Sequence, residues 1–342
     1  MVRVGIINVT GYMGAEAARL LHGHPEVELT SVTGRSAAGQ PLGEVFPHLG
    51  PLGLTVEEEL GEVDAVVSAL PHSASAQALL PYIERGLPVL DLSADFRLRR
   101  LEDYEPWYGA HPAPHLLAEA VFGLPELHRE EIARSKLVAG PGCHATAAIL
   151  ALAPAVRHGL IEPDMVVDSK TGISGAGRSL GLSYHFSEAN EGVSAYGLSG
   201  HRQLPEMTQE LGALWEAPAP RITFVPHLIP MTRGILVTCY ASLRQDADLG
   251  KDAVARLREL YCDFYRDSPF VRIVDQPPST KQTLGCNDCL LYPTVDGRAG
   301  RLIVVSVLDN LVKGGAGQGV QCLNLMLGLP ETAGLSGLAL YP

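Results

Sequence analysis

The sequence lacks any apolar run of roughly 18 residues, the length that a membrane-spanning helix needs. Its start, MVRVGIINVTGYMG, also lacks the apolar stretch of a secretory signal, because glycines interrupt it too early. Basic side chains are scarce as well, since 26 Lys and Arg against 38 Asp and Glu give a net charge of -12. This charge argues against a nucleic-acid or anionic-membrane partner, and we predict a cytoplasmic protein with neither.

Cysteine is sparse, with six residues in 342, which is too few for a disulfide scaffold. Cys286 and Cys289 form a C-x-x-C pair, but no second pair follows at the spacing of a zinc finger, so we predict no metal site. Cys239 lies in an apolar stretch, and Cys262 and Cys322 fall on predicted helices. These three thiols are expected to pack in the core.

The chain does have the length and composition of a folded protein. With 342 residues, 46% of them hydrophobic and 19% charged, it is long enough for about two domains of roughly 150 residues each. Its 36 glycines and 25 prolines are spread along the chain, which excludes the collagen-like, coiled-coil and disordered classes.

Up to residue 143, short β-branched runs alternate with helical stretches. This pattern is typical of a doubly wound α/β domain of the Rossmann type, with a parallel sheet covered on both faces. The predicted strands are Val2 to Ile7, Val27 to Thr33, Asp64 to Leu70, Pro88 to Leu92 and Lys136 to Ala139, with a helix over Tyr12 to Leu21.

After residue 143 the strands are longer and more polar, which predicts an α+β domain with a mostly antiparallel sheet. The expected elements are helices over Ala145 to Val156 and Asp252 to Tyr265, and strands over Met165 to Lys170, Gly234 to Leu243 and Arg301 to Leu308. Near the end of the chain, Val320, Leu323 and Leu327 recur on one helical face. The tail is therefore predicted to be an amphipathic helix that packs back on earlier structure.

Asn8, Gly11 and Gly14 stand three apart, directly after a predicted strand and at the start of a predicted helix. This is the spacing of a dinucleotide-binding turn, in which small residues let the backbone approach a pyrophosphate at a helix N-terminus. The first position is asparagine instead of glycine, but asparagine tolerates the left-handed conformation better than most residues. A glycine turn without a ligand is the alternative interpretation.

The end of the second predicted strand distinguishes between the two nicotinamide cofactors. An Asp or Glu there would bind the ribose 2′-hydroxyl of NAD, whereas this chain has Arg35 and Ser36 after Thr33 and Gly34. A guanidinium and a hydroxyl suit a 2′-phosphate, so NADP(H) is favoured over NAD.

Cys143 follows Gly140-Pro141-Gly142, between a buried strand and an alanine-rich helix. A cysteine in that position lies at a helix N-terminus, where the dipole favours the thiolate. Backbone N–H groups of the same turn could form an oxyanion site. We therefore predict that Cys143 is a nucleophile.

The middle of the chain concentrates polar residues and glycines over residues 168–206. The glycines around Ser174 and Gly175, together with Arg178, could form an anion-binding nest for phosphate or carboxylate oxygens. His201 is the best candidate for an acid/base.

Long sequence blocks resemble the N-acetyl-gamma-glutamyl-phosphate reductase family, in the family's order and nearly from end to end. The blocks are GIINVTGYMGAEAARLLHGHPEVE, LPHSASA, DLSADFRL, WYG, FGLPEL, AGPGCHAT, SKTGISGAGRS, HFSEAN, AYG, GHRQLPEM, PHLIPMTRGIL and DNLVKGGAGQGVQCLNLMLGLPET. The family is related to aspartate-semialdehyde dehydrogenase, and the resemblance implies that two-domain fold.

The resemblance implies an NADPH-dependent reductase of the third step from glutamate towards arginine. In that scheme Cys143 attacks the acyl phosphate and expels phosphate, hydride from NADPH reduces the thioester, and the thiohemiacetal collapses to N-acetylglutamate 5-semialdehyde. His201 would be the acid/base. The family block commonly reads HRH, whereas this chain has Gln203 at the third position, so the residue that carries the proton stays open.

The resemblance also assigns domains and binding residues. It implies an NADP-binding domain over residues 1–143 and 314–342, a catalytic and oligomerisation domain over 144–313, and a homodimer or homotetramer. Predicted cofactor-binding residues are Thr10, Gly11, Tyr12, Met13, Gly14, Arg35, Ser36, Gly315 and Gln318, and predicted substrate-binding residues are Ser174, Gly175, Arg178, Arg202 and Glu206. Because the substrate and the cofactor are polyanions, Lys170, Arg178, Arg202 and Arg233 are expected to form a basic funnel in an acidic chain.

Three alternatives remain open. The first is the lysine-pathway relative that reduces a carrier-bound 2-aminoadipyl 6-phosphate, which shares several of these blocks. The second is a Cys/His acyltransferase without redox chemistry, and the third is an NADP-binding sensor without catalysis.

Overall fold

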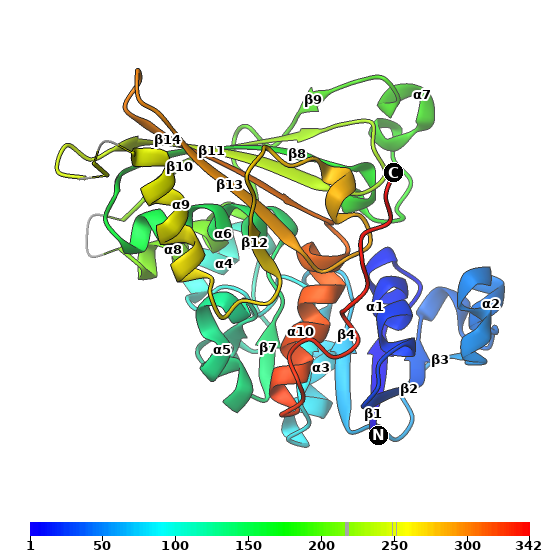
Figure 1. The fold of residues 1–342 in the computed structure, drawn as a ribbon. Coiled ribbons are helices and arrows are strands. Elements are labelled where there is room, and N and C mark those ends of the chain that lie inside the picture. The colour runs from blue at the N-terminus through cyan, green and yellow to red at the C-terminus, as the bar shows by residue number, and fades with distance from the viewer. Residues whose placement is uncertain (216–218, 248, 251) are drawn as a thin grey trace. The chain divides into compact units, whose positions relative to one another are not determined.

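The computed structural model describes residues 1–215, 219–247, 249–250 and 252–342. The chain divides into two compact units, each built on its own sheet (Figure 1): Met1–Pro141 with Gly315–Gly337, and Gly142–Gly314 with Leu338–Pro342. The last residues differ from the predicted division, which gave all of 314–342 to the first domain. Leu338–Pro342 belongs to the second unit, where Leu340 N donates to the Leu284 carbonyl oxygen at 2.8 Å.

The first unit contains a seven-stranded parallel sheet in the order β3-β2-β1-β4-β5-β7-β6. The strand order reverses between β1 and β4, and in doubly wound sheets ligands bind outside the carboxyl ends of the strands at this switch point. The predicted doubly wound α/β fold is confirmed. Its strands are β1 (Val2–Ile7), β2 (Val27–Thr33), β3 (Val56–Glu57), β4 (Ala65–Ser68), β5 (Val89–Asp91), β6 (Val121–Phe122) and β7 (Leu137–Ala139).

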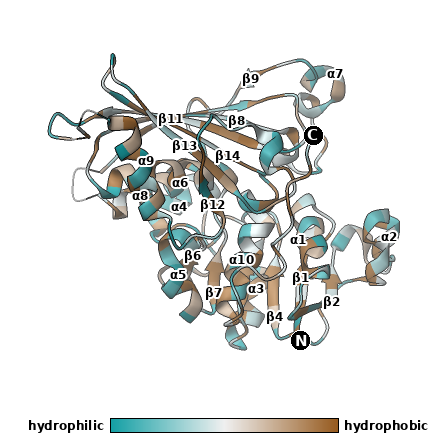
Figure 2. Cartoon of the chain, in the orientation of Figure 1, coloured by the Kyte–Doolittle hydropathy of each residue, from teal (hydrophilic) through white to brown (hydrophobic). Residues whose placement is uncertain are grey.

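The helices of this unit are α1 (Tyr12–His22), α2 (Leu42–Val45), α3 (Ser75–Glu84), α4 (Leu101–Tyr108), α5 (Pro125–Arg134) and α10 (Gly317–Met326). α1 contacts β1 and β2, and α3 contacts β4 and β5. α10 is the predicted tail helix; it buries Val320 and Leu323 and contacts α1, α5 and β5. Figure 2 shows β4 and β7 as predominantly apolar strands, which agrees with a sheet that is buried on both faces.

The second unit contains a mixed seven-stranded sheet in the order β12-β13-β14-β11-β8-β10-β9. The pairs β13/β14, β14/β11, β11/β8 and β10/β9 are antiparallel, and only β12/β13 and β8/β10 are parallel among the described residues. The predicted mostly antiparallel sheet is therefore confirmed. Its strands are β8 (Ile161–Thr171), β9 (Ser194–Ala195), β10 (Arg221–Leu228), β11 (Ile235–Leu243), β12 (Val271–Ile273), β13 (Cys289–Asp296) and β14 (Arg301–Leu308).

The helices α6 (Cys143–Arg157), α8 (Leu204–Ala213) and α9 (Ala253–Phe264) lie on one side of this sheet (Figure 1). α6 contacts β8, β11, β13 and β14, and its residues His144 to Val156 are all buried. Side chains alternate along a strand, and β11 alternates between buried and partly exposed residues. The helix-covered face is thus the core of the unit, and the opposite face is partly exposed. A short helix, α7 (Phe186–Ala189), lies in the segment before β9.

In the part of the chain that the structure describes, no helix is both long enough and apolar enough to cross a membrane.

Candidate active site

Cys143 is the first residue of α6 and is partly buried. The three residues before it form the turn that leaves β7, as the sequence predicted. Cys239 and Cys322 are buried as expected, but Cys262 is exposed on α9, so the prediction that it packs in the core is wrong. Helical periodicity alone does not say which face of a helix is covered.

Two side chains from the start of α8 cap the N-terminus of α6. Gln203 Oε1 accepts from His144 N at 2.9 Å and from Ala145 N at 3.2 Å. Glu206 Oε2 accepts from Gly142 N at 2.7 Å. The prediction that amides of this turn form an oxyanion site is therefore wrong for these three N–H groups, because side-chain oxygens already occupy them.

Two glycines make room for this arrangement. A Cβ on Gly142 would lie 2.3 Å from Gln203 Cδ, which is far inside van der Waals contact. A Cβ on Gly314 would lie 2.8 Å from Cys143 Cβ. The GPGC turn and the KGG turn therefore need glycine at these positions because other groups pack directly against them.

Two histidines lie against each other beside the start of α6. The ring centroids of His144 and His201 are 5.6 Å apart in an edge-to-face arrangement, and Phe224 packs against both rings. His144 Nδ1 is 2.7 Å from Ser169 Oγ, and its Nε2 is 3.1 Å from the hydroxyl of Tyr196.

Burial keeps both rings neutral at pH 7. It lowers the pKa of His144 to about 3, with a smaller contribution from His201, because a charged imidazole loses its hydration there. Burial and then the Arg202 charge lower the pKa of His201 to about 4. Burial, followed by the charge of Cys143, also raises the pKa of Tyr196, which keeps that phenol protonated.

The proton of His201 can be placed on one nitrogen. Nδ1 of His201 accepts a hydrogen bond from Gln203 N at 3.2 Å, and a backbone N–H can only donate. The neutral ring therefore carries its proton on Nε2 and presents a donor there. This assignment follows from the hydrogen-bond network, as tautomer assignments do.

The buried imidazole of His144 makes stability depend on pH. Its pKa in the folded chain, about 3, lies below the ordinary value of about 6.5, so the unfolded chain binds more protons between these values. Its contribution to stability is complete above about pH 6.5 and falls by a few kcal/mol as the pH drops towards 3. We expect H144Q to show a flatter decline in urea-unfolding free energy over that range than the wild type. An equal decline in both proteins would contradict the shift.

The predicted anion nest is not available as such. The backbone N–H groups of Gly172, Ile173, Ser174, Gly175 and Gly177 all donate to backbone carbonyl oxygens. Ser174 is also buried, and its Oγ accepts from Asn310 Nδ2 at 3.0 Å. The glycine-rich spacing here serves a tight 3₁₀ turn, so the nest prediction is wrong for these amides.

The predicted basic funnel is also only partly present. Lys170 Nζ lies 2.6 Å from Asp168 Oδ2, and Arg233 Nη1 lies 3.5 Å from the buried Asp309 Oδ2. Because Ser169 contacts His144, the next residue, Lys170, faces the opposite side of the sheet. Lys170 therefore does not belong to the Cys143 site.

The remaining predicted substrate residues differ in exposure. Gly175, Arg178 and Arg202 are exposed, with Arg202 directly between His201 and Gln203. Glu206 is only 1% exposed, which together with its bond to Gly142 N makes it a support of the turn. The structure does not present Glu206 to a ligand.

In the first unit, the predicted dinucleotide turn lies at the carboxyl ends of β1 and β4. Asn8 has φ +66°, the left-handed conformation that glycine provides elsewhere, and its Nδ2 donates to the Ala69 carbonyl oxygen at 2.8 Å. The Thr10 hydroxyl donates to Asn8 Oδ1 at 3.3 Å. A Cβ on Gly14 would lie 2.4 Å from Asn8 O, so the helix can cross the strand closely only with glycine there.

The other predicted cofactor residues of this turn lie at the start of α1. Gly11 is the N-cap residue, Tyr12 is exposed, and Met13 is partly buried. Arg35 and Ser36 form an exposed turn directly after β2. The first turn of α1 holds no acidic side chain, which leaves its positive end open to an anion.

The returning segment brings Gly315 and Gln318 into the first unit, where both are buried. Gln318 Nε2 donates to the Gly123 carbonyl oxygen at 2.9 Å, whereas its Oε1 is buried without a hydrogen-bond partner among the described residues. A buried acceptor of this kind is suited to an N–H donor of a ligand. The glycine cradle, the open helix start and this acceptor fit a bound dinucleotide.

Sequence reasoning missed several contributors to the site. Ser169 and Tyr196 hold His144, and Gln203 caps the nucleophile's helix. Each of the three lies inside a block that resembles the family, which was the available signal. Their roles depend on contacts between distant parts of the chain.

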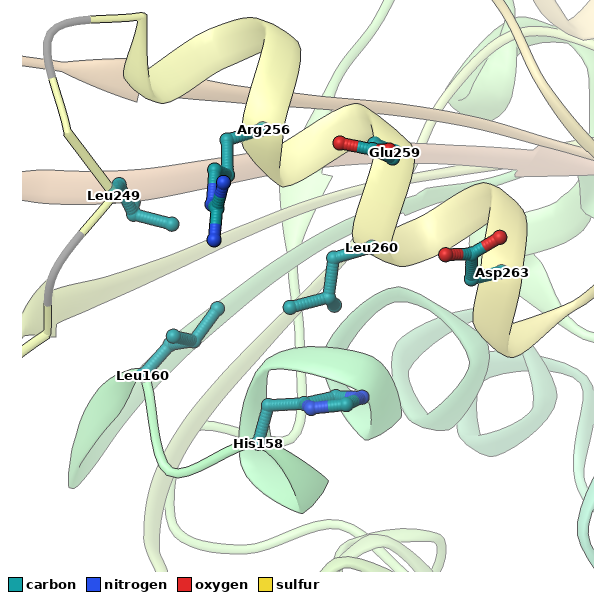
Figure 3. A pocket seen from close by; sticks show the side chains of 7 residues that line it. All are labelled: His158, Leu160, Leu249, Arg256, Glu259, Leu260 and Asp263. Carbon is teal, nitrogen blue, oxygen red and sulfur yellow. The ribbon is translucent and has the colours of Figure 1, made fainter.

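A surface pocket lies elsewhere in the second unit, beside α9 and the C-terminal end of α6 (Figure 3). Its lining residues are His158, Leu160, Leu249, Arg256, Glu259, Leu260 and Asp263. α6 has 15 residues, and at 1.5 Å per residue this places the pocket about 20 Å from Cys143. The pocket is therefore separate from the candidate active site.

Two family models match the chain. One, described as the NAD binding domain of semialdehyde dehydrogenase, matches residues 3–135, and the other, described as the semialdehyde dehydrogenase dimerisation domain, matches residues 143–310. Aspartate semialdehyde dehydrogenase II from Vibrio cholerae, in complex with ASA, has a TM-score of 0.70 at 16% identity and covers 96% of this chain and 98% of its own. The enzyme from Candida albicans, solved with NADP, gives 0.70 at 18% identity with the same coverage. The two family models together with the fold thus place this chain in the semialdehyde dehydrogenase class.

Curated relatives identify the family within this class. The N-acetyl-gamma-glutamyl-phosphate reductase of Dehalococcoides mccartyi is 52% identical over 342 residues, which cover 99% of both chains. That of Pelotomaculum thermopropionicum is 48% identical, covering 100% of this chain and 99% of its own. This chain belongs to the N-acetyl-gamma-glutamyl-phosphate reductase family, as the sequence blocks predicted.

Proposed function

We propose that this chain reduces N-acetyl-L-glutamyl 5-phosphate to N-acetyl-L-glutamate 5-semialdehyde and phosphate with NADPH, the third step from glutamate towards arginine. The proposal is carried by Cys143 at the start of α6, beside the neutral pair of His144 and His201. The identity of 52% to a reductase of that name supports the choice of substrate.

Cys143 Sγ is the nucleophile of the proposed reaction. It attacks the acyl carbon, the C–S bond forms, and the bond to the phosphate oxygen breaks, which leaves a thioester on Cys143. NADPH, when bound, would supply the hydride to the acyl carbon. The C–S bond then breaks, which releases the semialdehyde and restores the Cys143 thiolate.

His201 is the proposed acid/base, and Nε2 is the nitrogen available to the substrate. With Nδ1 engaged by Gln203 N, the neutral ring donates from Nε2 to the oxygen of the reacting acyl group. A neutral buried imidazole can stabilise developing charge on oxygen in this way. To accept the thiol proton, the ring must first release its bond from Gln203 N.

The cofactor would be held by the first unit. We propose that the turn from Thr10 to Gly14 binds the pyrophosphate at the start of α1, and that Arg35 and Ser36 bind the 2′-phosphate. Gly315 and Gln318 of the returning segment would also bind the cofactor, with the Gln318 Oε1 acceptor taking an N–H donor of the cofactor.

For the substrate we propose Arg178 and Arg202 as ligands of its anionic groups, because both are exposed guanidinium groups in the catalytic unit. Ser174 and Gly175 would shape the loop that carries Arg178, and Glu206 would support the nucleophile's turn. Met1–Pro141 with Gly315–Gly337 would act as the NADP domain, and Gly142–Gly314 with Leu338–Pro342 as the catalytic and oligomerisation domain.

We also propose a homodimer or homotetramer located in the cytoplasm. The name of the family model over residues 143–310 supports self-association. So do exposed apolar side chains in one segment of the second unit, which are Leu180, Leu182, Phe186, Val193 and Leu198. Sedimentation equilibrium measures the oligomeric state directly, and a monomeric mass would contradict the proposed homodimer or homotetramer.

A reverse-direction assay tests the function. We expect the purified chain to form NADPH from N-acetylglutamate semialdehyde, phosphate and NADP, and to form none when phosphate is left out. The forward assay should use both free N-acetylglutamyl phosphate and carrier-bound aminoadipyl phosphate. Activity with the carrier-bound substrate alone would assign the chain to the lysine-pathway relative, and no reduction of either would exclude a reductase.

Cofactor preference tests the role of Arg35. R35A should lower kcat/KM for NADPH by about 10-fold or more, because it removes a charged hydrogen bond to phosphate, and should change kcat/KM for NADH little. R99A, a loss of the same charge from the first unit's surface, is the matched control. An equal loss with both cofactors, or a wild type that prefers NADH, would contradict the assignment.

A further inference from the structure

The side-chain amide of Gln203 has a defined orientation. Its oxygen faces His144 N and Ala145 N, at 2.9 and 3.2 Å. Both partners are backbone N–H groups, which can only donate, so the atom that faces them must be Oε1. The two hydrogen bonds therefore determine where Nε2 points: away from the helix end that Oε1 caps.

Gln203 Nε2 has donor capacity that the protein leaves unused. It carries two N–H groups and has no acceptor among the described residues, although the side chain is partly buried. The same amide packs against Gly142, the residue before Cys143. An unpaired donor is thus held rigidly next to the nucleophile.

The proposed reaction needs hydrogen-bond donors next to Cys143. When Cys143 attacks an acyl carbon, negative charge develops on the acyl oxygen, and preorganised N–H groups stabilise it. Three amides of the turn are already occupied by Gln203 Oε1 and Glu206 Oε2. The charge must therefore be met by other donors.

We propose that Gln203 is a catalytic residue whose Nε2 donates to the acyl oxygen during formation and reduction of the Cys143 thioester. His201 Nε2 supplies a second donor from the adjacent ring. The inference rests on the proposed function and adds a role to it. His201 alone transfers the proton, whereas Gln203, whose amide is neither an acid nor a base at neutral pH, binds the acyl oxygen. Oε1 performs the structural task and Nε2 the chemical one.

Q203E separates these two tasks. Glutamate has the same shape, and one carboxylate oxygen still caps His144 N and Ala145 N, where the helix dipole favours negative charge. The other oxygen replaces the donor with an acceptor. We expect kcat for the semialdehyde, phosphate and NADP reaction to fall about 10²- to 10³-fold, with the thermal unfolding midpoint retained.

Alkylation of Cys143 by iodoacetamide distinguishes a catalytic role of Gln203 from a structural one, because a purely structural role would change the alkylation rate in Q203E. Alkylation forms a C–S bond without creating an oxyanion, so its limiting rate at high pH in Q203E should stay within about threefold of the wild-type rate. Q77E, the same charge change on the exposed face of α3, is the matched control and should retain turnover.

Two results would overturn the proposal: turnover by Q203E within about threefold of the wild type, or alkylation and turnover that fall in equal proportion. If Q203E does not fold, Q203M provides the same comparison. Methionine removes both the cap and the donor, and the fall in turnover must still be larger than the fall in the alkylation rate. A wild-type chain without turnover would instead contradict the proposed function, which distinguishes the two failures.

Discussion

Replacing Cys143 with serine is expected to lower turnover with semialdehyde, phosphate and NADP by about 10⁴-fold or more. A serine hydroxyl is a much weaker nucleophile than a thiolate, and the start of a helix favours the thiolate form that cysteine reaches at neutral pH. The neighbouring rings do not compensate, because burial holds the pKa of His201 at about 4 and that of His144 at about 3. NADPH binding, followed by fluorescence, should be unchanged.

C262S is the matched control for this change. Cys262 is exposed on α9 in the same unit, so the same atom is replaced without touching the turn before α6. We expect its turnover to equal that of the wild type. If C143S retains phosphate-dependent turnover, the covalent mechanism is wrong; if C143S and C262S lose activity alike, the effect is not specific to Cys143.

The second large effect is expected for H201N, which should lower kcat by about 10²- to 10⁴-fold. Asparagine can place an oxygen near the position of Nδ1 and keep the hydrogen bond from Gln203 N, but it has no atom at the position of Nε2. The variant therefore removes the donor that faces the substrate while keeping the local loop. The KM for the semialdehyde should change much less than kcat.

The pH profile gives a second measurement on His201. With a pKa of about 4 the ring is neutral throughout the range from pH 6 to 8, so wild-type turnover should show no inflection near the ordinary histidine value of about 6.5 that H201N abolishes. An inflection of that kind would mean that the ring titrates normally. H158N, at the exposed C-terminal end of α6, is the control and should behave as the wild type.

The periodicity of apolar residues, with the glycines and prolines between the apolar runs, predicted the type of both sheets and part of their strands, but not β3, β6, β9, β10, β12 or β13. The short apolar runs before residue 143 became the parallel strands β1, β2, β4, β5 and β7, and the longer alternating runs became β8, β11 and β14. Asn8 in a glycine position was interpreted correctly, because its left-handed φ is a property that a single residue type carries with it. Such features are local, and local patterns are what one sequence records.

The wrong predictions concern the hydrogen-bond and ion-pair partners of the predicted site residues. The SKTGISGAG stretch was interpreted as an anion nest, yet its amides donate to carbonyl oxygens that belong largely to residues 231–234. Lys170 and Arg233 were assigned to the basic funnel, yet Asp168 and Asp309 pair with them. Spacing cannot reveal these partners, because hydrogen bonds and ion pairs form between residues that only the fold brings together.

By itself the sequence determined the family, the type of each sheet, and the cysteine at the start of a helix, because these depend on residue types and their local spacing. Only the tertiary structure decided how Cys143 is surrounded. Gln203 and Glu206 stand 59 and 64 residues from the amides they cap, and their contact closes the helix end that the sequence left open. The physical reason is that a backbone N–H binds whichever acceptor the fold places against it, and here that acceptor is the side-chain oxygen of Gln203.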